Sequence, residues 1–188
     1  MLSQKIELYD SIEFNKRVLF IVWILVLSKC LILEYYIQDL AIPINSTFFI
    51  WSLSLGLTAL ASYLFLKRSN SLQIFENDKL RVRVILNLVI FIVLAALNST
   101  NLILDYFNWA YLMATNFALL GIYFIANGLL KLDKFKFIAG SYLIIASAFI
   151  SQCEFLSVYL YSSFLLIILA IQLIIDLIIY RKTTISTK

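Results

Sequence analysis

The sequence predicts an all-α integral membrane protein, folded as a six-helix transmembrane bundle with both termini in the cytoplasm. Three observations support this prediction: the composition, the lengths of the apolar runs, and the positions of the basic residues between the runs. Of the 188 residues, 63% are apolar and 14% are charged, and the mean hydropathy is +0.95. Soluble domains are roughly half apolar and a quarter charged, so this composition indicates a protein that lies in a lipid bilayer.

Six apolar runs follow one another along the chain. A bilayer core of about 30 Å needs about 20 residues of helix to cross it. Only a helix satisfies its own backbone hydrogen bonds in hydrocarbon, and a barrel strand would alternate polar and apolar side chains. The predicted spans, which together form one membrane domain, are 18–38, 47–66, 82–104, 107–130, 137–152 and 155–180.

The segment 1–17 precedes the first span and is predicted to lie in the cytoplasm, as is the tail 181–188. It carries Glu7, Asp10 and Glu13, and no small-residue cleavage site follows the first run. We therefore expect a retained first span rather than a signal peptide. A short interfacial helix and a solvated tail are the two alternatives for this segment.

The basic residues determine the predicted topology, because Lys and Arg favour the cytoplasmic side of short loops. They lie before the first run, between the second and third, between the fourth and fifth, and after the sixth, whereas the other gaps contain Asp39, Asp105 and Glu154. The fifth run has only 16 residues, about 24 Å of helix, so a re-entrant hairpin is its alternative. Six crossings place every basic cluster on one side, whereas a hairpin would move Arg181 and Lys182 to the opposite side.

Small residues in the fourth run predict where helices pack closely, since helices in lipid associate through close backbone approach. Ala110, Ala114, Ala118 and Gly121 follow one another at spacings of four, four and three, which forms a continuous ridge on one helix face. The sixth run is bulky and branched, so we expect it to face lipid or a partner, and to tolerate Ala170→Leu if it faces lipid. The second run carries a shorter small-residue set that is also predicted to pack centrally: Ser52, Gly56 and Ala59.

The sequence offers little for catalysis. It contains no histidine, which removes the commonest general base and the commonest transition-metal ligand. Cys30 lies near the middle of the first span and Cys153 at the outer end of the fifth, so we expect two unpaired thiols. The four glycines are scattered through the spans and form no phosphate-binding loop. We therefore predict that the chain is not an enzyme and has neither a cofactor nor a metal site.

Lys29 is the most unusual residue of the predicted spans. It lies 11 residues after the start of its span, about 16 Å into the core, where a lysine costs about 2.5–3.5 kcal/mol. Glu34, which we expect at the outer rim, is a poor partner, because five residues rotate a helix by about 140°. The predicted partners are Gln172 and Asp176 on the sixth span, with Asn116 on the fourth as the alternative. Lys29 is either a site for an anion, a proton or an acidic lipid, or a structural lysine hydrogen-bonded across helices.

A second polar cluster, from Asn98 to Asn101, ends the third span on its predicted outer side. Helix capping explains this cluster, and an alternative is that Asn98, Asn116 and Lys29 line a path from the outside to the middle of the membrane.

Three functions from different classes are consistent with these features. The first is a non-enzymatic multi-pass subunit of the plasma membrane, or of the inner membrane in a prokaryote. It would form a homo-oligomer or a membrane complex and couple the bilayer to a cytoplasmic effector that docks at Lys67 to Arg81, as a sensor or anchor in a signalling, envelope or defence system. The alternatives are a small channel or transporter with a site around Lys29, and an intramembrane enzyme that acts on lipid. The net charge of +4 follows from the topology and from attraction to anionic lipids, so the lipid bilayer is a predicted partner and nucleic acid is not.

Overall fold

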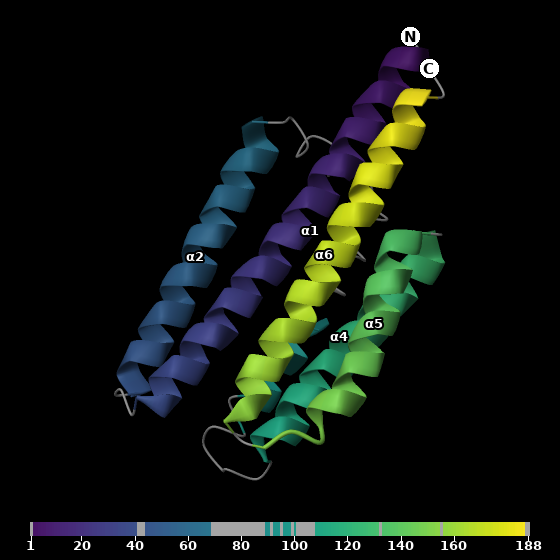
Figure 1. The fold of residues 1–188 in the computed structure, drawn as a ribbon. Helices are drawn as coiled ribbons and strands as arrows, with labels where there is room; N and C mark the ends of the chain where they lie inside the picture. The colour runs from purple at the N-terminus through teal and green to yellow at the C-terminus, as the bar shows by residue number, and fades with distance from the viewer. Residues whose placement is uncertain are drawn as a thin grey trace. The chain divides into compact units, whose positions relative to one another are not determined.

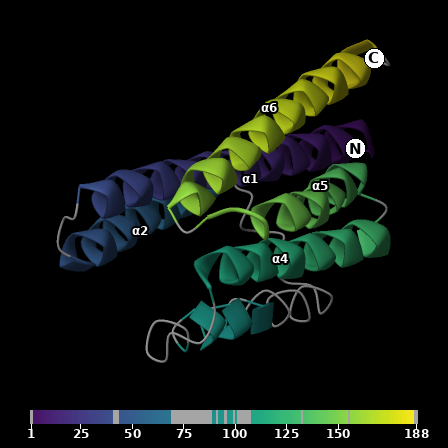
Figure 2. The ribbon, with the colours of Figure 1, turned by 60° about the horizontal axis from the view of Figure 1, so that its bottom comes forward.

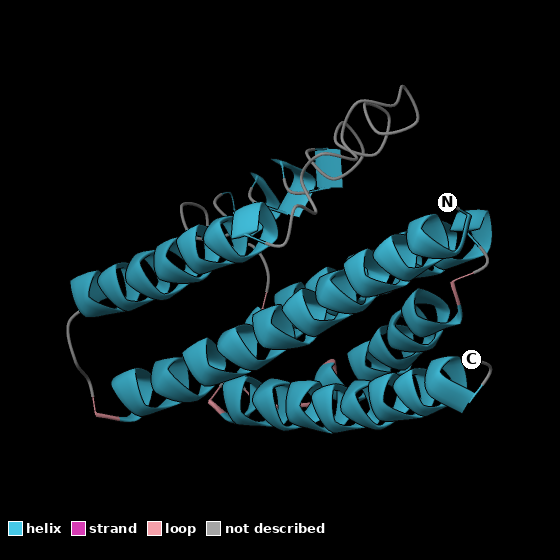
Figure 3. Cartoon of the chain, turned by 90° about the horizontal axis from the view of Figure 1, so that it is seen from above, coloured by secondary structure: helices cyan, strands magenta, loops and turns pink. Residues whose placement is uncertain are grey.

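The computed structural model of the chain describes residues 2–40, 44–68, 89–90, 92–94, 96–98, 100, 108–131, 133–154 and 156–186. All regular secondary structure within these residues is α-helical, which confirms the predicted all-α class (Figures 1 and 3). The helices are α1 (Leu2–Asp39), α2 (Ile44–Arg68), α4 (Trp109–Lys131), α5 (Lys134–Ile150) and α6 (Ser157–Ser186).

Four of these helices are long and apolar enough to cross a membrane. Their apolar segments are Phe14–Asp39, Phe49–Arg68, Trp109–Leu129 and Ser157–Arg181. The predicted fifth span corresponds to α5, which has 17 residues. The predicted third span, 82–104, lies largely outside the described residues, and its described positions, from 89 to 100, are helical. The structure therefore supports a membrane protein with several apolar helices.

Helix α1 is longer than one span. Its 38 residues correspond to about 57 Å at 1.5 Å per residue, against a bilayer core of about 30 Å. The helix continues without a break through the boundary predicted at 17 and 18. The predicted N-terminal segment is thus neither a separate interfacial helix nor a coil, because it extends the helix of the first span.

The chain divides into two compact units, which we describe one at a time. The first unit comprises 1–75 and 166–188, and so contains α1, α2 and the second part of α6. The second unit comprises 76–165, and so contains α4, α5 and the beginning of α6.

In the second unit, α4 and α5 form a closely packed helical hairpin (Figure 2). A Cβ atom at Gly140 would lie 2.6 Å from the carbonyl oxygen of Gly121, and one at Gly128 would lie 2.7 Å from the amide nitrogen of Phe137. Glycine therefore allows the two backbones to touch, as is typical of helix pairs in lipid. The predicted ridge of small residues lies on α4, where Ala110, Ala114 and Gly121 are buried and Ala118 is half-buried.

In the first unit, α1 and α2 are antiparallel neighbours (Figure 1). Helix α2 turns its polar stripe toward α1, and its small residues face outward: Ser52, Gly56 and Ala59 are exposed, and a Cβ at Gly56 would meet nothing within 4 Å. The expectation that these three residues pack centrally is therefore wrong. The polar face of α2, and not its small-residue face, contacts α1.

Helix α6 has one buried face, so it is not surrounded by lipid on all sides. Leu169, Ala170 and Leu173 are 0% exposed, whereas Ile168, Ile171 and Ile175 are exposed. The expectation that Ala170 faces lipid is therefore wrong. Composition alone suggested it, because both faces of this helix are built from the same bulky apolar residues.

Candidate intramembrane polar sites

The α1–α2 contact is built around a stripe of polar side chains on α2. Trp51, Ser54, Thr58 and Ser62 recur at spacings of three, four and four, which places them on one helix face, and all four are half-buried. The Thr58 hydroxyl donates to the Ser54 carbonyl oxygen at 2.7 Å. This spacing was present in the sequence and could have identified the contact face of α2.

Glu34 is the centre of the polar cluster at one end of this contact. It is 6% exposed, and each of its carboxylate oxygens accepts a hydrogen bond at 3.0 Å, one from the Trp51 indole N–H and one from the Gln38 amide. A buried carboxylate without such donors would be costly, so the two bonds stabilise its burial. Sequence reasoning placed Glu34 at the outer rim and missed its role. The structure shows that it ties α1 to α2.

Cys30 lies one turn along α1 from Glu34 and is 0% exposed. Its side chain lies near that of Ser54 on α2. Cys153 follows α5, and both cysteines are free thiols. Burial raises the pKa of the Cys153 thiol. Within the described residues, no three His, Cys, Asp or Glu side chains come together in a way that could hold a metal ion.

Lys29 takes no part in the polar contact between α1 and α2. Its neighbours in the chain, Ser28 and Cys30, are buried, whereas Lys29 is exposed together with Val22 and Leu25. Within the described part of the chain, no hydrogen bond or ion pair reaches Lys29. Lys29, which was predicted to lie near the middle of the membrane, is therefore exposed on the surface of α1.

Two cation–π contacts define the register of α1 against α6 in the first unit. The Arg17 guanidinium lies 4.4 Å from the centroid of the Tyr180 ring, and the Arg181 guanidinium lies 5.8 Å from that of Phe14. These helices run in opposite directions, as the neighbouring N and C labels in Figure 1 show. Residue 17 of α1 is therefore level with residue 180 of α6.

This register places Gln172 about 6 Å, and Asp176 about 12 Å, from the level of Lys29 along the helix axes. At 1.5 Å per residue, Lys29 lies about 18 Å along α1 from residue 17, and Gln172 and Asp176 lie about 12 Å and 6 Å along α6 from residue 180. Side chains tilt toward the N-terminus of their helix. Because α1 and α6 are antiparallel, this tilt brings the end of the Lys29 side chain and the ends of the Gln172 and Asp176 side chains closer in depth. Gln172 is exposed and Asp176 is half-buried. Within one chain, Lys29 forms no hydrogen bond or ion pair with Gln172 or Asp176 among the described residues, and part of the surface of each of the three side chains is accessible.

Asn98 and Asn116 are joined directly in the second unit. Each side-chain amide donates to the other's carbonyl oxygen, at 3.1 Å and 3.0 Å, and the Asn98 amide also donates to the Leu94 carbonyl oxygen at 2.7 Å. This reciprocal pair links the described part of the third run to α4 across a sequence separation of 18 residues. Its amide groups satisfy each other, as interhelical polar pairs in membranes do.

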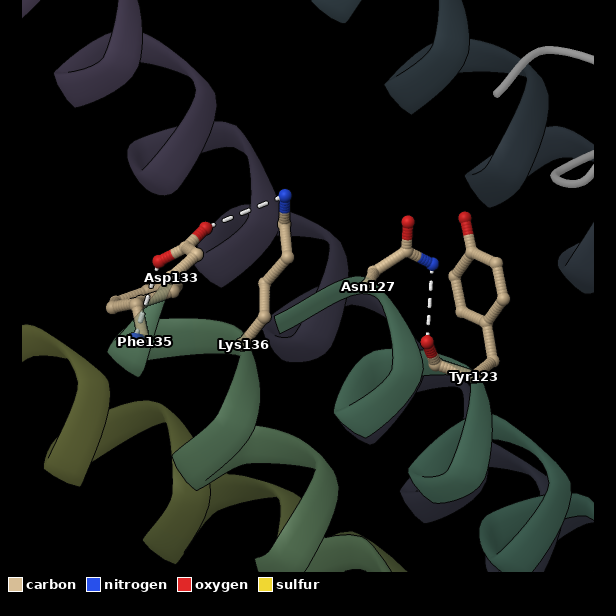
Figure 4. A network of polar contacts seen from close by, with 5 residues as sticks. All are labelled: Tyr123, Asn127, Asp133, Phe135 and Lys136. Carbon is tan, nitrogen blue, oxygen red and sulfur yellow. Dashed lines mark hydrogen bonds and ion pairs between the residues drawn. The ribbon is translucent and has the colours of Figure 1, made fainter. Parts of the chain in front are cut away.

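The connection between α4 and α5 has its own polar contacts (Figure 4). Asp133 caps α5 by accepting from the Phe135 amide at 3.2 Å, and it forms an ion pair with Lys136 at 3.4 Å. On α4, the buried Asn127 amide donates to the Tyr123 carbonyl oxygen at 3.0 Å. These contacts are local to α4 and to the start of α5, and they leave no carboxylate pair arranged for acid–base chemistry among the residues drawn.

Comparison of the chain with protein-family models, with curated proteins and with solved structures gives no match.

Proposed function

We propose that this protein is a non-enzymatic, multi-pass subunit of the plasma membrane that assembles with further copies of itself and couples the bilayer to a cytoplasmic effector. In this proposal, six spans cross the membrane and both termini lie in the cytoplasm. The described helices supply four segments of sufficient length and hydropathy, and the basic residues at their ends supply the orientation. The proposed docking segment, Lys67 to Arg81, lies outside the described residues beyond Arg68.

The exposure of Lys29 is the observation that carries the proposal. Its Cα lies about 22 Å along α1 from Phe14 and about 15 Å from Asp39, the two ends of the apolar segment. A lysine at that depth costs about 2.5–3.5 kcal/mol when it faces lipid. Burial against polar groups of another molecule would remove this cost. Lys29 therefore favours an assembled state.

A second copy of the chain offers suitable polar groups. Gln172 lies on α6 about 6 Å from the level of Lys29, and Asp176 lies one helical turn farther from that level. Neither forms a hydrogen bond or ion pair with Lys29 among the described residues. Pairing Lys29 of one copy with the carboxylate and amide of the next would satisfy the charge. The neighbouring exposed apolar residues, Leu25 on α1 and Ile175 on α6, would pack around the pair.

The test is the Lys29→Met variant, studied for oligomer size in lipid nanodiscs over a range of protein-to-lipid ratios. Methionine removes the cost of a lipid-facing charge in the monomer, so we expect the monomer fraction to rise and the association constant to fall by up to about a hundredfold. Leu53→Met, on the exposed face of α2, is the matched control and should leave oligomer size unchanged. Unchanged association of Lys29→Met would contradict the proposal.

A small channel or transporter built around Lys29 is the second candidate, because an exposed midplane lysine would also suit a water-filled path. The same variant distinguishes the two functions. In a channel or transporter, Lys29→Met would keep the oligomer and abolish the cellular phenotype that deletion of the gene produces. In the proposed subunit, loss of the oligomer would accompany loss of that phenotype.

A further inference from the structure

We infer that the groove between α1 and α2 binds one acyl chain of an anionic phospholipid, whose headgroup is held by the basic residues at the open ends of these two helices. The groove has a volume of about 500 Å³. It is lined almost wholly by apolar side chains from two turns of α1 and three turns of α2. The lining residues are Val18, Leu19, Val22, Leu57, Thr58, Ala61, Ser62 and Phe65.

The dimensions of the groove suit a lipid tail. Along α2 it extends from Leu57 to Phe65, about 12 Å at 1.5 Å per residue. One leaflet of the hydrocarbon core is about 15 Å deep, half of the whole core. The groove is therefore about as long as one leaflet is deep. All but two of its lining side chains, those of Thr58 and Ser62, are apolar.

The register of the two helices places four cations at one end of the groove. The Glu34–Trp51 hydrogen bond sets residue 34 of α1 level with residue 51 of α2. Arg17 lies 17 residues before Glu34 on α1, and Arg68 lies 17 residues after Trp51 on α2. Because the two helices are antiparallel, Arg17 and Arg68 lie at the same depth. Lys16 and Lys67 lie beside them in sequence, and all but the half-buried Arg17 are exposed.

Charge complementarity therefore identifies the ligand. Basic residues between helices at the membrane surface attract anionic headgroups, and each contributes roughly equally near the surface. The groove begins directly below this level, at Val18 on α1 and Phe65 on α2. A lipid with its phosphate at the three exposed cations, Lys16, Lys67 and Arg68, would lay one tail into the groove. The Ser62 hydroxyl is buried in this lining and has no hydrogen-bond partner among the described residues, so it offers a donor to the glycerol ester region.

The experiment is native mass spectrometry of the purified full-length protein, titrated with phosphatidylglycerol or phosphatidylcholine. We expect one phosphatidylglycerol to be retained per chain, at concentrations where phosphatidylcholine is lost. Ala61→Phe fills the groove and should reduce retention at least tenfold. Ala59→Phe, on an exposed position of the same helix outside the groove, should leave retention unchanged.

A second variant keeps the test decisive if Ala61→Phe disturbs folding. Replacing Lys67 and Arg68 together by glutamine changes two exposed side chains, and it should weaken phosphatidylglycerol binding about thirtyfold while leaving phosphatidylcholine unaffected. Lys134→Gln, an exposed cation at the start of α5, is the control. The inference is overturned if the two lipids bind equally, if the wild-type protein retains neither, or if the groove and charge variants bind like their controls.

Discussion

The α4–α5 contact predicts that Gly140→Ala destabilises the protein, although alanine is the better helix former. A Cβ at position 140 would lie 2.6 Å from the carbonyl oxygen of Gly121 and 2.7 Å from the amide nitrogen of Ile125. Both are backbone atoms, so neither can move aside by a side-chain rotation. The two helices must separate by several tenths of an ångström along their whole glycine contact.

The size of the effect follows from two opposing contributions. Overpacking of a well-packed contact costs about 1–3 kcal/mol, and the backbone contacts at Gly140 place this change in the upper half of that range. The gain in helix propensity from glycine to alanine returns up to about 1 kcal/mol. We therefore expect a net loss of about 1–2 kcal/mol in the free energy of unfolding.

Gly56→Ala is the matched control, because the same substitution on α2 meets nothing within 4 Å. It should be neutral or should stabilise the protein by up to about 1 kcal/mol. The assay is unfolding of the purified protein in mixed micelles by titration with sodium dodecyl sulfate, followed by circular dichroism. If both substitutions shift the midpoint equally, the close backbone contact between α4 and α5 does not exist.

Three further changes test other parts of the structure. A double-mutant cycle with Asn98→Ala and Asn116→Ala should show a coupling energy of about 0.6–1.7 kcal/mol in the same unfolding assay, and strict additivity would exclude the amide pair. Ala170→Leu should destabilise the protein by about 1–3 kcal/mol because Ala170 is 0% exposed, and a neutral result would mean that this face of α6 is open to lipid. Because burial raises the pKa of the Cys153 thiol, its alkylation at pH 7.5 should be slower than that of Gln152→Cys in a Cys153→Ser background, and the difference should shrink as the pH rises through both thiol pKa values. Equal rates at pH 7.5 would contradict the partly buried environment of Cys153.

The all-helical class and the apolar helices were predictable, because composition and run length depend on the bilayer and not on tertiary detail. The ridge from Ala110 to Gly121 was predicted from a local pattern of small residues, and the structure buries Ala110, Ala114 and Gly121 on α4. The orientation of α2 was not predicted correctly. Its face with Gly56 and its face with Ser54 both have helical spacing, and only the partner helix, with Glu34 and Cys30, decides between them.

Long-range polar contacts were the hardest part of the candidate sites to predict. Asn98 and Asn116 were both selected from the sequence as polar residues in predicted spans, but nothing in the sequence states that they bond to each other. Glu34 was assigned to the rim because depth along the helix is easier to estimate than rotation about it. Gln172 and Asp176 were predicted as protein partners of Lys29, and the structure presents Lys29 on the surface of α1.

Crosslinking between copies in native membranes tests the proposed assembly most directly. Two differently tagged copies would be co-expressed in a Cys30→Ala, Cys153→Ser background, one with Leu25→Cys on the Lys29 face of α1 and the other with Ile175→Cys on α6. We predict that a short bis-maleimide joins the two tags in one band, and that Leu60→Cys on α2 in place of Ile175→Cys gives no such band. Absence of the mixed band from the Leu25→Cys and Ile175→Cys pair, or equal yield with Leu60→Cys, would contradict assembly through Lys29.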